Sequence, residues 1–198
     1  MRFFFKTILF LVFCLSLFCK EEGNSSTVAD VPSSPNKSNV VEIQIKWEYS
    51  QIPLRMDIRE PSGSQSLTLW ATGTVAKGRP APFSVSIPDS KIFLKPGSKK
   101  QFLLVMENPS DKAVHFFAAP HHAHPVEHSF GFKFKCLCVN HAFSIPAGET
   151  WYRVVEIRLS PDFLGDKLIL THNLIGITKE RVAEFEKAAS QSISNDLD

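Results

Sequence analysis

The sequence predicts an all-β protein, an antiparallel β-sandwich with a short helix at its C-terminal end. Apolar and polar residues alternate over short runs such as Val41–Tyr49, which is typical of strands with two different faces. Turn-forming residues separate these runs, as at Pro96-Gly97 and at Pro146-Ala147-Gly148. The apolar spacing of three or four residues that indicates a helix does not recur before residue 178.

The expected elements follow one another along the chain. Roughly seven to nine strands are predicted, a number and spacing typical of a sandwich. The runs concerned are 41–49, 67–75, 83–87, 91–94, 101–107, 113–118, 130–139, 151–159 and 167–177. A helix is expected after Thr178, whose side chain can cap it. Its apolar residues recur at three or four, as Val182, Phe185, Ala189 and Ile193.

The first 40 residues predict export and a tether. Two basic residues, Arg2 and Lys6, precede the apolar stretch 7–18. This stretch matches a signal sequence and is shorter than the ~20 residues needed to span a bilayer. The stretch ends in a run that resembles a lipobox, so 1–19 is interpreted as a lipoprotein signal with Cys19 lipidated. An uncleaved anchor and simple secretion are the alternatives. Residues 20–40 are rich in Ser, Asn, Pro and Glu and are predicted to be a flexible tether. Each interpretation places the folded part outside the cytoplasm.

Length, charge and composition limit the function. Residues 41–177 suit one sandwich domain, with 178–198 as a C-terminal helix and tail. The net charge of +2 gives no support to nucleic-acid binding. The sequence contains no nucleophile elbow, no phosphate-binding loop and no carboxylate pair at a catalytic spacing. We therefore expect neither enzyme activity nor a nucleic-acid partner.

Two cysteines separated by one residue are the most informative chemical feature. Cys14 and Cys19 lie in the N-terminal signal, so the domain keeps only Cys136 and Cys138. In the predicted strand 130–139 these two point to the same face, with Cα atoms roughly 6.5–7 Å apart. That separation is at the limit for an unstrained disulfide, but two thiolates can converge on one soft metal ion. Cu(I) is favoured, because it accepts two or three soft ligands. Two structural thiols or a strained disulfide are the alternative.

A series of motifs resembles a known protein family. In order along the chain, they are Asn108–Val114, Phe132–Val139, Ile145–Glu149, Ile157–Asp162 and Leu168–Thr171. In this order and at this spacing they resemble the copper-delivery assembly factors of cytochrome c oxidase, the family that serves the copper B site. The resemblance covers about Trp70 to Ile175. It implies an immunoglobulin-like sandwich in the periplasm or the intermembrane space, with Cu(I) held by Cys136 and Cys138. It also allows a homodimer that shares copper between facing motifs.

The sequence departs from that family in three ways. It has no transmembrane helix directly before the domain, and it lacks a cysteine after Ile52-Pro53-Leu54. Histidines are also concentrated around the cysteine pair, several of them in the run 121–125, which is predicted to be a loop. The candidates to replace the missing thiol as metal ligands are His121, His122, His124, His128 and His141. A polar, solvated loop that binds no metal is the alternative.

Taken together, the residues and the resemblance predict a membrane-tethered, extracytoplasmic Cu(I) chaperone that delivers copper to a respiratory cytochrome oxidase. Its partner would be the copper-site subunit of that oxidase, and the N-terminal anchor would hold it at the membrane. The alternative is a metal-sequestering or metal-sensing lipoprotein that uses the histidine-rich loop and assembles no oxidase.

Overall fold

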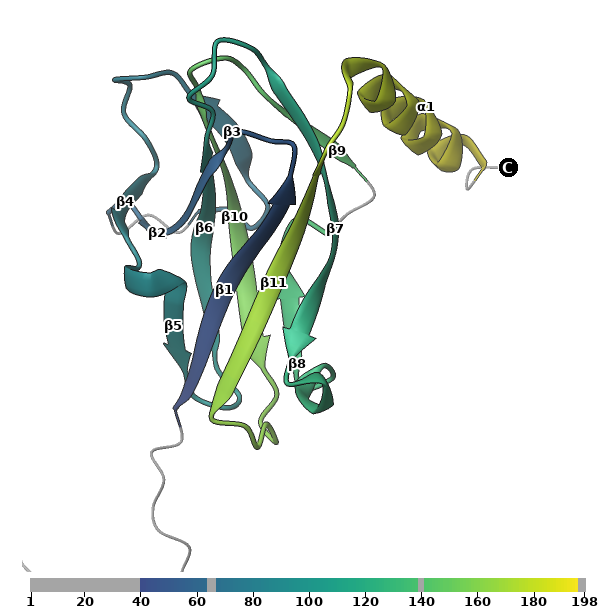
Figure 1. Ribbon diagram of the computed structural model, residues 1–198. Helices are drawn as coiled ribbons and strands as arrows, with labels where there is room; N and C mark the ends of the chain where they lie inside the picture. The colour runs from purple at the N-terminus through teal and green to yellow at the C-terminus, as the bar shows by residue number, and fades with distance from the viewer. Residues whose placement is uncertain (1–39, 64–66, 139–140, 196–198) are drawn as a thin grey trace, which may run out of the picture. The chain divides into compact units, whose positions relative to one another are not determined.

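Two facing β-sheets and a C-terminal helix make up the computed structural model (Figure 1), which describes residues 40–63, 67–138 and 141–195. The predicted all-β sandwich with a short C-terminal helix is therefore confirmed. The predicted signal sequence, most of the tether and the lipidation site Cys19 lie outside the described residues. Within the described part of the chain, no helix combines the length and apolar character needed to cross a membrane.

The first sheet has five strands and contains both the first and the last strand of the domain. In spatial order they are β5 (Lys91–Leu94), β1 (Val41–Ser50), β11 (Lys167–Gly176), β7 (Val114–His124) and β9 (Ala142–Ile145). β1 and β11 run parallel and in continuous register, with Glu42 opposite Lys167 and Ser50 opposite Ile175. The other strand pairs in this sheet are antiparallel. The predicted antiparallel sandwich thus includes a parallel pair formed by its first and last strands.

The second sheet is built around β10 and β6. In spatial order its strands are β3 (Thr72–Val75), β10 (Thr150–Leu159), β6 (Lys99–Glu107), β2 (Arg55–Pro61) and β4 (Phe83–Ser86). A further strand, β8 (Phe132–Lys135), pairs with the second half of β10, whereas β3 pairs with its first half. Two short 3-10 turns, η1 (Pro88–Ser90) and η2 (Val126–His128), connect strands. β8 leads directly into the cysteine pair.

The core lies between the two sheets and follows the alternation of the strands. On β11 the inward row consists of Leu168, Leu170, His172 and Leu174, none of which is exposed. Across from it, β6 and β10 contribute Phe102, Leu104, Val155 and Ile157. A smaller apolar cluster covers the outer face of the same two strands, with Leu103, Val105 and Val154 buried there. These strands are therefore apolar on both faces, which explains why their sequences alternate less clearly.

The C-terminal helix α1 (Lys179–Asn195) begins where the sequence predicts. The Thr178 hydroxyl accepts a hydrogen bond from the Arg181 backbone N–H at 3.3 Å, as an N-cap residue does. Phe185 stacks on Phe117 of β7, with the ring centroids 5.0 Å apart. This contact attaches the helix to the outer face of the first sheet.

Several predictions about individual elements are wrong. Of the strand predicted over 67–75, only Thr72–Val75 forms β3. Strands β2 and β9 were not expected. Four of the seven residues of β2 are charged, so its apolar alternation is weak. The run 121–125 is not a loop. β7 continues to His124, because its pairing with β11 extends to His124, which lies opposite Ile169. The strand predicted over 130–139 covers only β8 and ends before the first cysteine.

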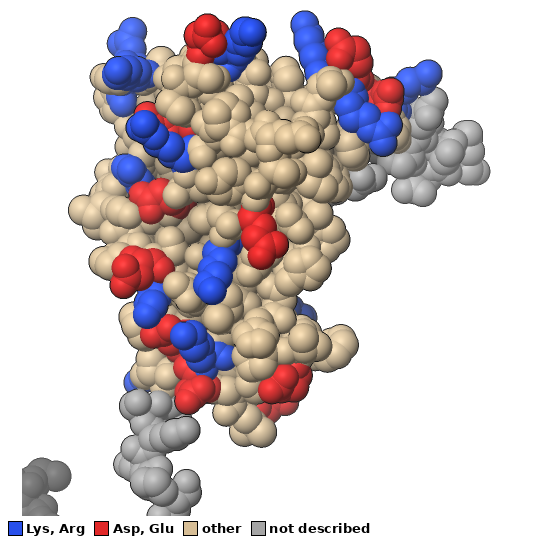
Figure 2. Space-filling view, viewed as in Figure 1, with Lys and Arg blue, Asp and Glu red and all other residues tan. Residues whose placement is uncertain are grey.

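Charged residues of both signs are interspersed over the face seen in Figure 2 rather than gathered in one basic area. Opposite charges are often neighbours. Glu42, for example, lies 3.4 Å from the Lys91 Nζ and 3.5 Å from the Lys167 Nζ through its two carboxylate oxygens. Such partly exposed pairs contribute little to stability.

Candidate metal centre

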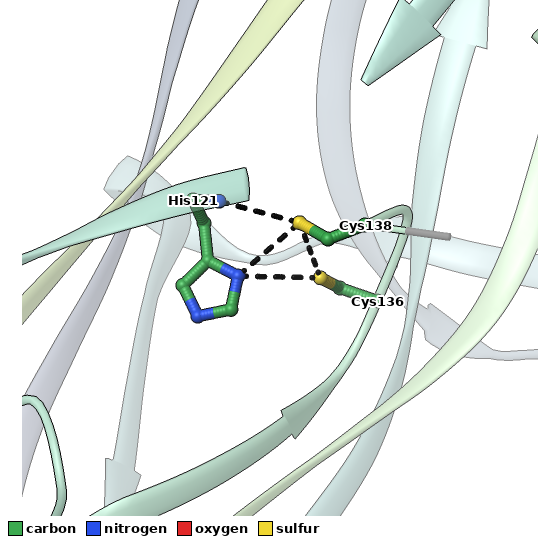
Figure 3. Close-up of side chains that lie close together, drawn as sticks. All are labelled: His121, Cys136 and Cys138. Carbon is green, nitrogen blue, oxygen red and sulfur yellow. Dashed lines mark hydrogen bonds between the residues drawn. The ribbon is translucent and has the colours of Figure 1, made fainter. Parts of the chain in front are cut away.

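Three side chains with metal-binding atoms meet just beyond the end of β8: Cys136, Cys138 and His121 (Figure 3). The two Sγ atoms are 3.2 Å apart. The His121 Nδ1 lies 3.3 Å from the Cys138 Sγ and 3.5 Å from the Cys136 Sγ. All three ligand atoms fall within 4.8 Å of one another. The site therefore brings together both predicted cysteines and one of the five candidate histidines.

The cysteines converge because a buried leucine anchors the bend between them. Cys136 and Leu137 leave the β8 strand in a bend, and Leu137 is fully buried in the main core. Cys136 is buried with it at 4% exposure, whereas Cys138 is only partly buried. The prediction of two thiols on one exposed strand end is thus wrong in two respects, since neither cysteine lies within β8 and one of them is buried. They still point toward the same place.

A β-bulge in β7 turns His121 toward the sulfurs. Across the β7–β11 pair, His122 lies opposite Thr171 and Ala119 lies opposite Asn173. Two residues of β7, Pro120 and His121, therefore stand opposite a single residue of β11, which is the pattern of a bulge. The His121 backbone N–H donates a hydrogen bond to the Cys138 Sγ at 3.3 Å. The bulge thus supplies a backbone donor as well as an imidazole to the same sulfur.

The two thiols share a proton unequally. The Cys136 thiol donates a hydrogen bond to the Cys138 Sγ, which raises the pKa of Cys136, and burial raises it further. The same hydrogen bond lowers the pKa of Cys138 far below that of an ordinary thiol, and His121 adds to this effect. The opposite shifts favour a thiolate at Cys138 and a protonated thiol at Cys136, an arrangement in which metal binding displaces one proton from the sulfurs.

We expect iodoacetamide to alkylate Cys138 much faster than Cys136, at pH 6 as well as at pH 8. Because its pKa is lowered, the Cys138 sulfur stays a thiolate at pH 6, where an ordinary thiol is almost fully protonated. Cys136 stays protonated and buried. Peptide mass spectrometry after short exposures of the metal-free protein would give both rates. Equal rates, or a Cys138 rate that falls about tenfold per pH unit between pH 8 and 6, would contradict the shared-proton pair.

His172 of β11 also lies beside the cluster, and the sequence analysis missed it. Its ring is 6.1 Å from the His121 ring and stacks on Trp47 at 5.0 Å. Burial lowers the pKa of His172, while the nearby Cys138 opposes this lowering. No hydrogen bond of good geometry joins the two, and both ring nitrogens lack a partner among the described residues. The signal was present in the sequence: in the predicted strand 167–177, His172 lies on the same face as three leucines, at 168, 170 and 174.

The other four candidate histidines lie outside the cluster. His122 and His124 are exposed on β7, in positions that alternate with those facing the core. His128 lies in η2 with its ring 4.9 Å from the Phe163 ring. His141 is exposed and meets Phe143 edge-on at 5.1 Å. None of them belongs to the group of three ligand atoms found among the described residues.

A buried cation stands close to the cysteine pair. Arg153 of β10 is only 8% exposed, and its Nε has no hydrogen-bond partner among the described residues. Its guanidinium carbon lies 5.5 Å from the centroid of the Phe143 ring. Burial lowers the pKa of Arg153, and an interaction with the nearby Cys136 opposes that change. The site therefore has a positive group that can balance anionic sulfur.

The donor set fits a soft or borderline metal ion. Two sulfurs and one imidazole nitrogen are the ligands that copper and zinc prefer over magnesium or calcium. With metal–sulfur bonds of about 2.3 Å, a tetrahedral site needs sulfurs roughly 3.8 Å apart. The two Sγ atoms at 3.2 Å would have to separate by about half an ångström, which a small side-chain rotation provides. The three residues could therefore hold a copper or zinc ion.

A β-sandwich with a Cys–Cys–His cluster between strand β7 and the end of β8 defines a domain with a candidate metal centre. The chain belongs to a family described as a domain of unknown function (DUF8709), whose model matches residues 41–177. A search of curated proteins found no significant match.

Proposed function

We propose that this protein is a membrane-tethered, extracytoplasmic Cu(I) chaperone that supplies copper to a respiratory cytochrome oxidase. The observation that carries the proposal is the convergence of the Cys136 and Cys138 sulfurs with the His121 Nδ1 within 4.8 Å. The delivery role, the oxidase partner and the position at the membrane rest on the motif resemblance and on the N-terminal sequence.

Charge and ligand softness favour Cu(I). Two thiolates and one Cu(I) ion carry one net negative charge, which the buried Arg153 can balance. Cu(I) accepts a site of two sulfurs and one nitrogen without further ligands, and thiolates are among the donors that select it. The low pKa of Cys138 favours the thiolate form that the metal needs.

The unequal exposure of the two sulfurs suggests the order of transfer. Cys138 is partly exposed, whereas Cys136 is buried. A thiolate or imidazole of the partner would therefore replace Cys138 first, and the buried Cys136 would release copper last. Exchange of one ligand at a time keeps the ion bound throughout the transfer. The geometry thus suits a donor site that is open on one side.

The alternative function, metal sequestration or sensing through the histidine-rich segment, receives less support. That segment is a strand and not a loop, and it directs only His121 toward the cysteines. His122 and His124 remain on the exposed side of β7. A site made of these two histidines alone would hold Cu(I) more weakly than one with two thiolates.

A combined biochemical and cellular experiment tests the proposal. Full-length protein kept reduced in detergent should retain one Cu(I) per chain against a competing chelator, with copper X-ray absorption that fits two sulfurs and one nitrogen. In the source cells, deletion of the gene should yield oxidase deficient in copper. The wild-type gene should restore the copper, whereas a Cys136→Ser gene should not. Full oxidase copper in the deletion strain would refute delivery, and lack of Cu(I) retention would refute the chaperone altogether.

A further inference from the structure

We propose that His172 is a fourth metal ligand, which converts the Cys136, Cys138 and His121 group into a four-ligand site able to hold a divalent ion of the zinc class. This inference rests on the proposed function, because it requires that the first three residues bind metal. It adds a second state to the site. Cu(I) would use the three-ligand form, and a tetrahedral divalent ion would use all four ligands.

The first observation is that His172 is buried without a partner. None of its surface is exposed, and neither ring nitrogen has a hydrogen-bond partner among the residues that the structure describes. Leaving a buried polar group unpaired is unfavourable, and a bound ion or water is one way to satisfy it. A leucine at position 172 would pack well in this inward row of β11, as its neighbours Leu170 and Leu174 do. A histidine here is costly for the fold unless its nitrogen binds something.

The second observation is where that nitrogen-bearing ring lies. The β7 bulge places Pro120 and His121 opposite His172, so the two histidines face each other at one point of the sheet. Their ring centroids are 6.1 Å apart, and the Phe134 ring centroid lies 5.4 Å from that of His172 and 5.6 Å from that of His121. The Cys138 thiolate is near enough to affect the pKa of His172. The ring thus borders the cluster directly.

The chemistry of the four groups is that of a known coordination type. Two thiolates and two neutral imidazoles form the Cys₂His₂ set that binds zinc tetrahedrally. The His172 nitrogens lie outside the group of atoms within 4.8 Å of one another, so binding a fourth ligand requires a small movement of the ring or of the thiols. Trp47, stacked on the ring at 5.0 Å, limits the directions of that movement.

The test uses Co(II) as a spectroscopic probe for the divalent state. Reduced, full-length protein is titrated with Co(II) in the absence of oxygen, and Zn(II) is then added to displace it. Wild-type protein should give the intense visible absorption of a tetrahedral site with thiolate ligands. A His172→Phe variant, which keeps a ring in the aromatic pocket, should lose that intensity and bind Zn(II) at least about tenfold more weakly. Its Cu(I) affinity should stay close to that of wild type.

Controls separate a ligand from a purely structural residue. His122→Phe changes an exposed histidine of the neighbouring strand and should leave the Co(II) spectrum and the Zn(II) affinity unchanged. Thermal unfolding should show that His172→Phe reduces the increase in Tm caused by Zn(II), whatever its effect on the metal-free protein. Zinc X-ray absorption of wild-type protein provides a second measurement that needs no variant, and it should fit two sulfurs and two nitrogens.

The outcomes also distinguish this inference from the proposed function. Tight Cu(I) binding together with a weak, non-tetrahedral Co(II) spectrum in wild type would overturn the role of His172 alone. The same holds for an unchanged Zn(II) affinity in His172→Phe, or for zinc X-ray absorption with a single nitrogen. If wild-type protein bound neither Cu(I) nor Co(II), the proposed function and this inference would both be overturned.

Discussion

Replacement of both sulfurs, Cys136→Ser with Cys138→Ser, is expected to lower the Cu(I) affinity of the protein roughly ten-thousand-fold. The variant loses two of the three proposed ligands and keeps only His121, and a serine hydroxyl is a poor ligand for a soft ion. The geometry of the fold should survive, because serine is close to cysteine in size. Titration against a chelator of known Cu(I) affinity, without oxygen, would measure the loss.

The matched control for this variant is His122→Ala with His124→Ala. It removes two potential ligands from the same region, but these imidazoles lie on the exposed side of β7. We expect its Cu(I) affinity to equal that of wild type. If the histidine variant lost most of the affinity and the serine variant kept it, the metal would be held by the surface histidines and the sulfurs would be structural.

The sandwich and the cysteine pair could be predicted from local sequence patterns. Alternation over Val41–Tyr49 and over 167–177 indicated strands without any knowledge of their partners. The one-residue spacing of Cys136 and Cys138 also sufficed to predict that the sulfurs converge. The structural cause of this convergence differs from the predicted one, however. The pair lies in a bend that Leu137 anchors in the core, and not in a strand.

The choice of histidine could not be predicted in the same way. Five histidines near the cysteines in sequence were all candidates, and the one that meets the sulfurs is selected by a bulge between β7 and β11. A bulge depends on the pairing of two strands about 50 residues apart, so no pattern within one segment reveals it. His172 differs, because its place in the alternation of β11 already predicted an inward side chain. Its proximity to the cysteines, which are far away in the sequence, follows only from the pairing of β11 with β7.

The site also depends on the core for its shape, because Cys136 and Leu137 belong to the same buried cluster as the main apolar residues of both sheets. The bend that presents the sulfurs is therefore held by packing and not by strand pairing. The stability of the protein and the preorganisation of the metal ligands should therefore change together when that packing is disturbed.

We expect Leu137→Ala to reduce the free energy of unfolding of the metal-free protein by about 3 kcal/mol. Leu137 is fully buried, so the change removes buried methyl groups and leaves a cavity between the two sheets. The bend should also become less well fixed, so the Cu(I) affinity should fall although no ligand is altered. Equilibrium unfolding in urea gives the stability, and chelator competition on the same samples gives the affinity.

Leu164→Ala is the matched control, because it makes the same chemical change at a side chain that is 95% exposed. Its effect on the free energy of unfolding should stay within about 0.5 kcal/mol, and its Cu(I) affinity should be that of wild type. Equal stability losses in the two variants would mean that Leu137 does not anchor the bend. A large stability loss in Leu137→Ala with unchanged Cu(I) affinity would mean that the sulfurs are positioned by the metal itself, and that core packing contributes little to their arrangement.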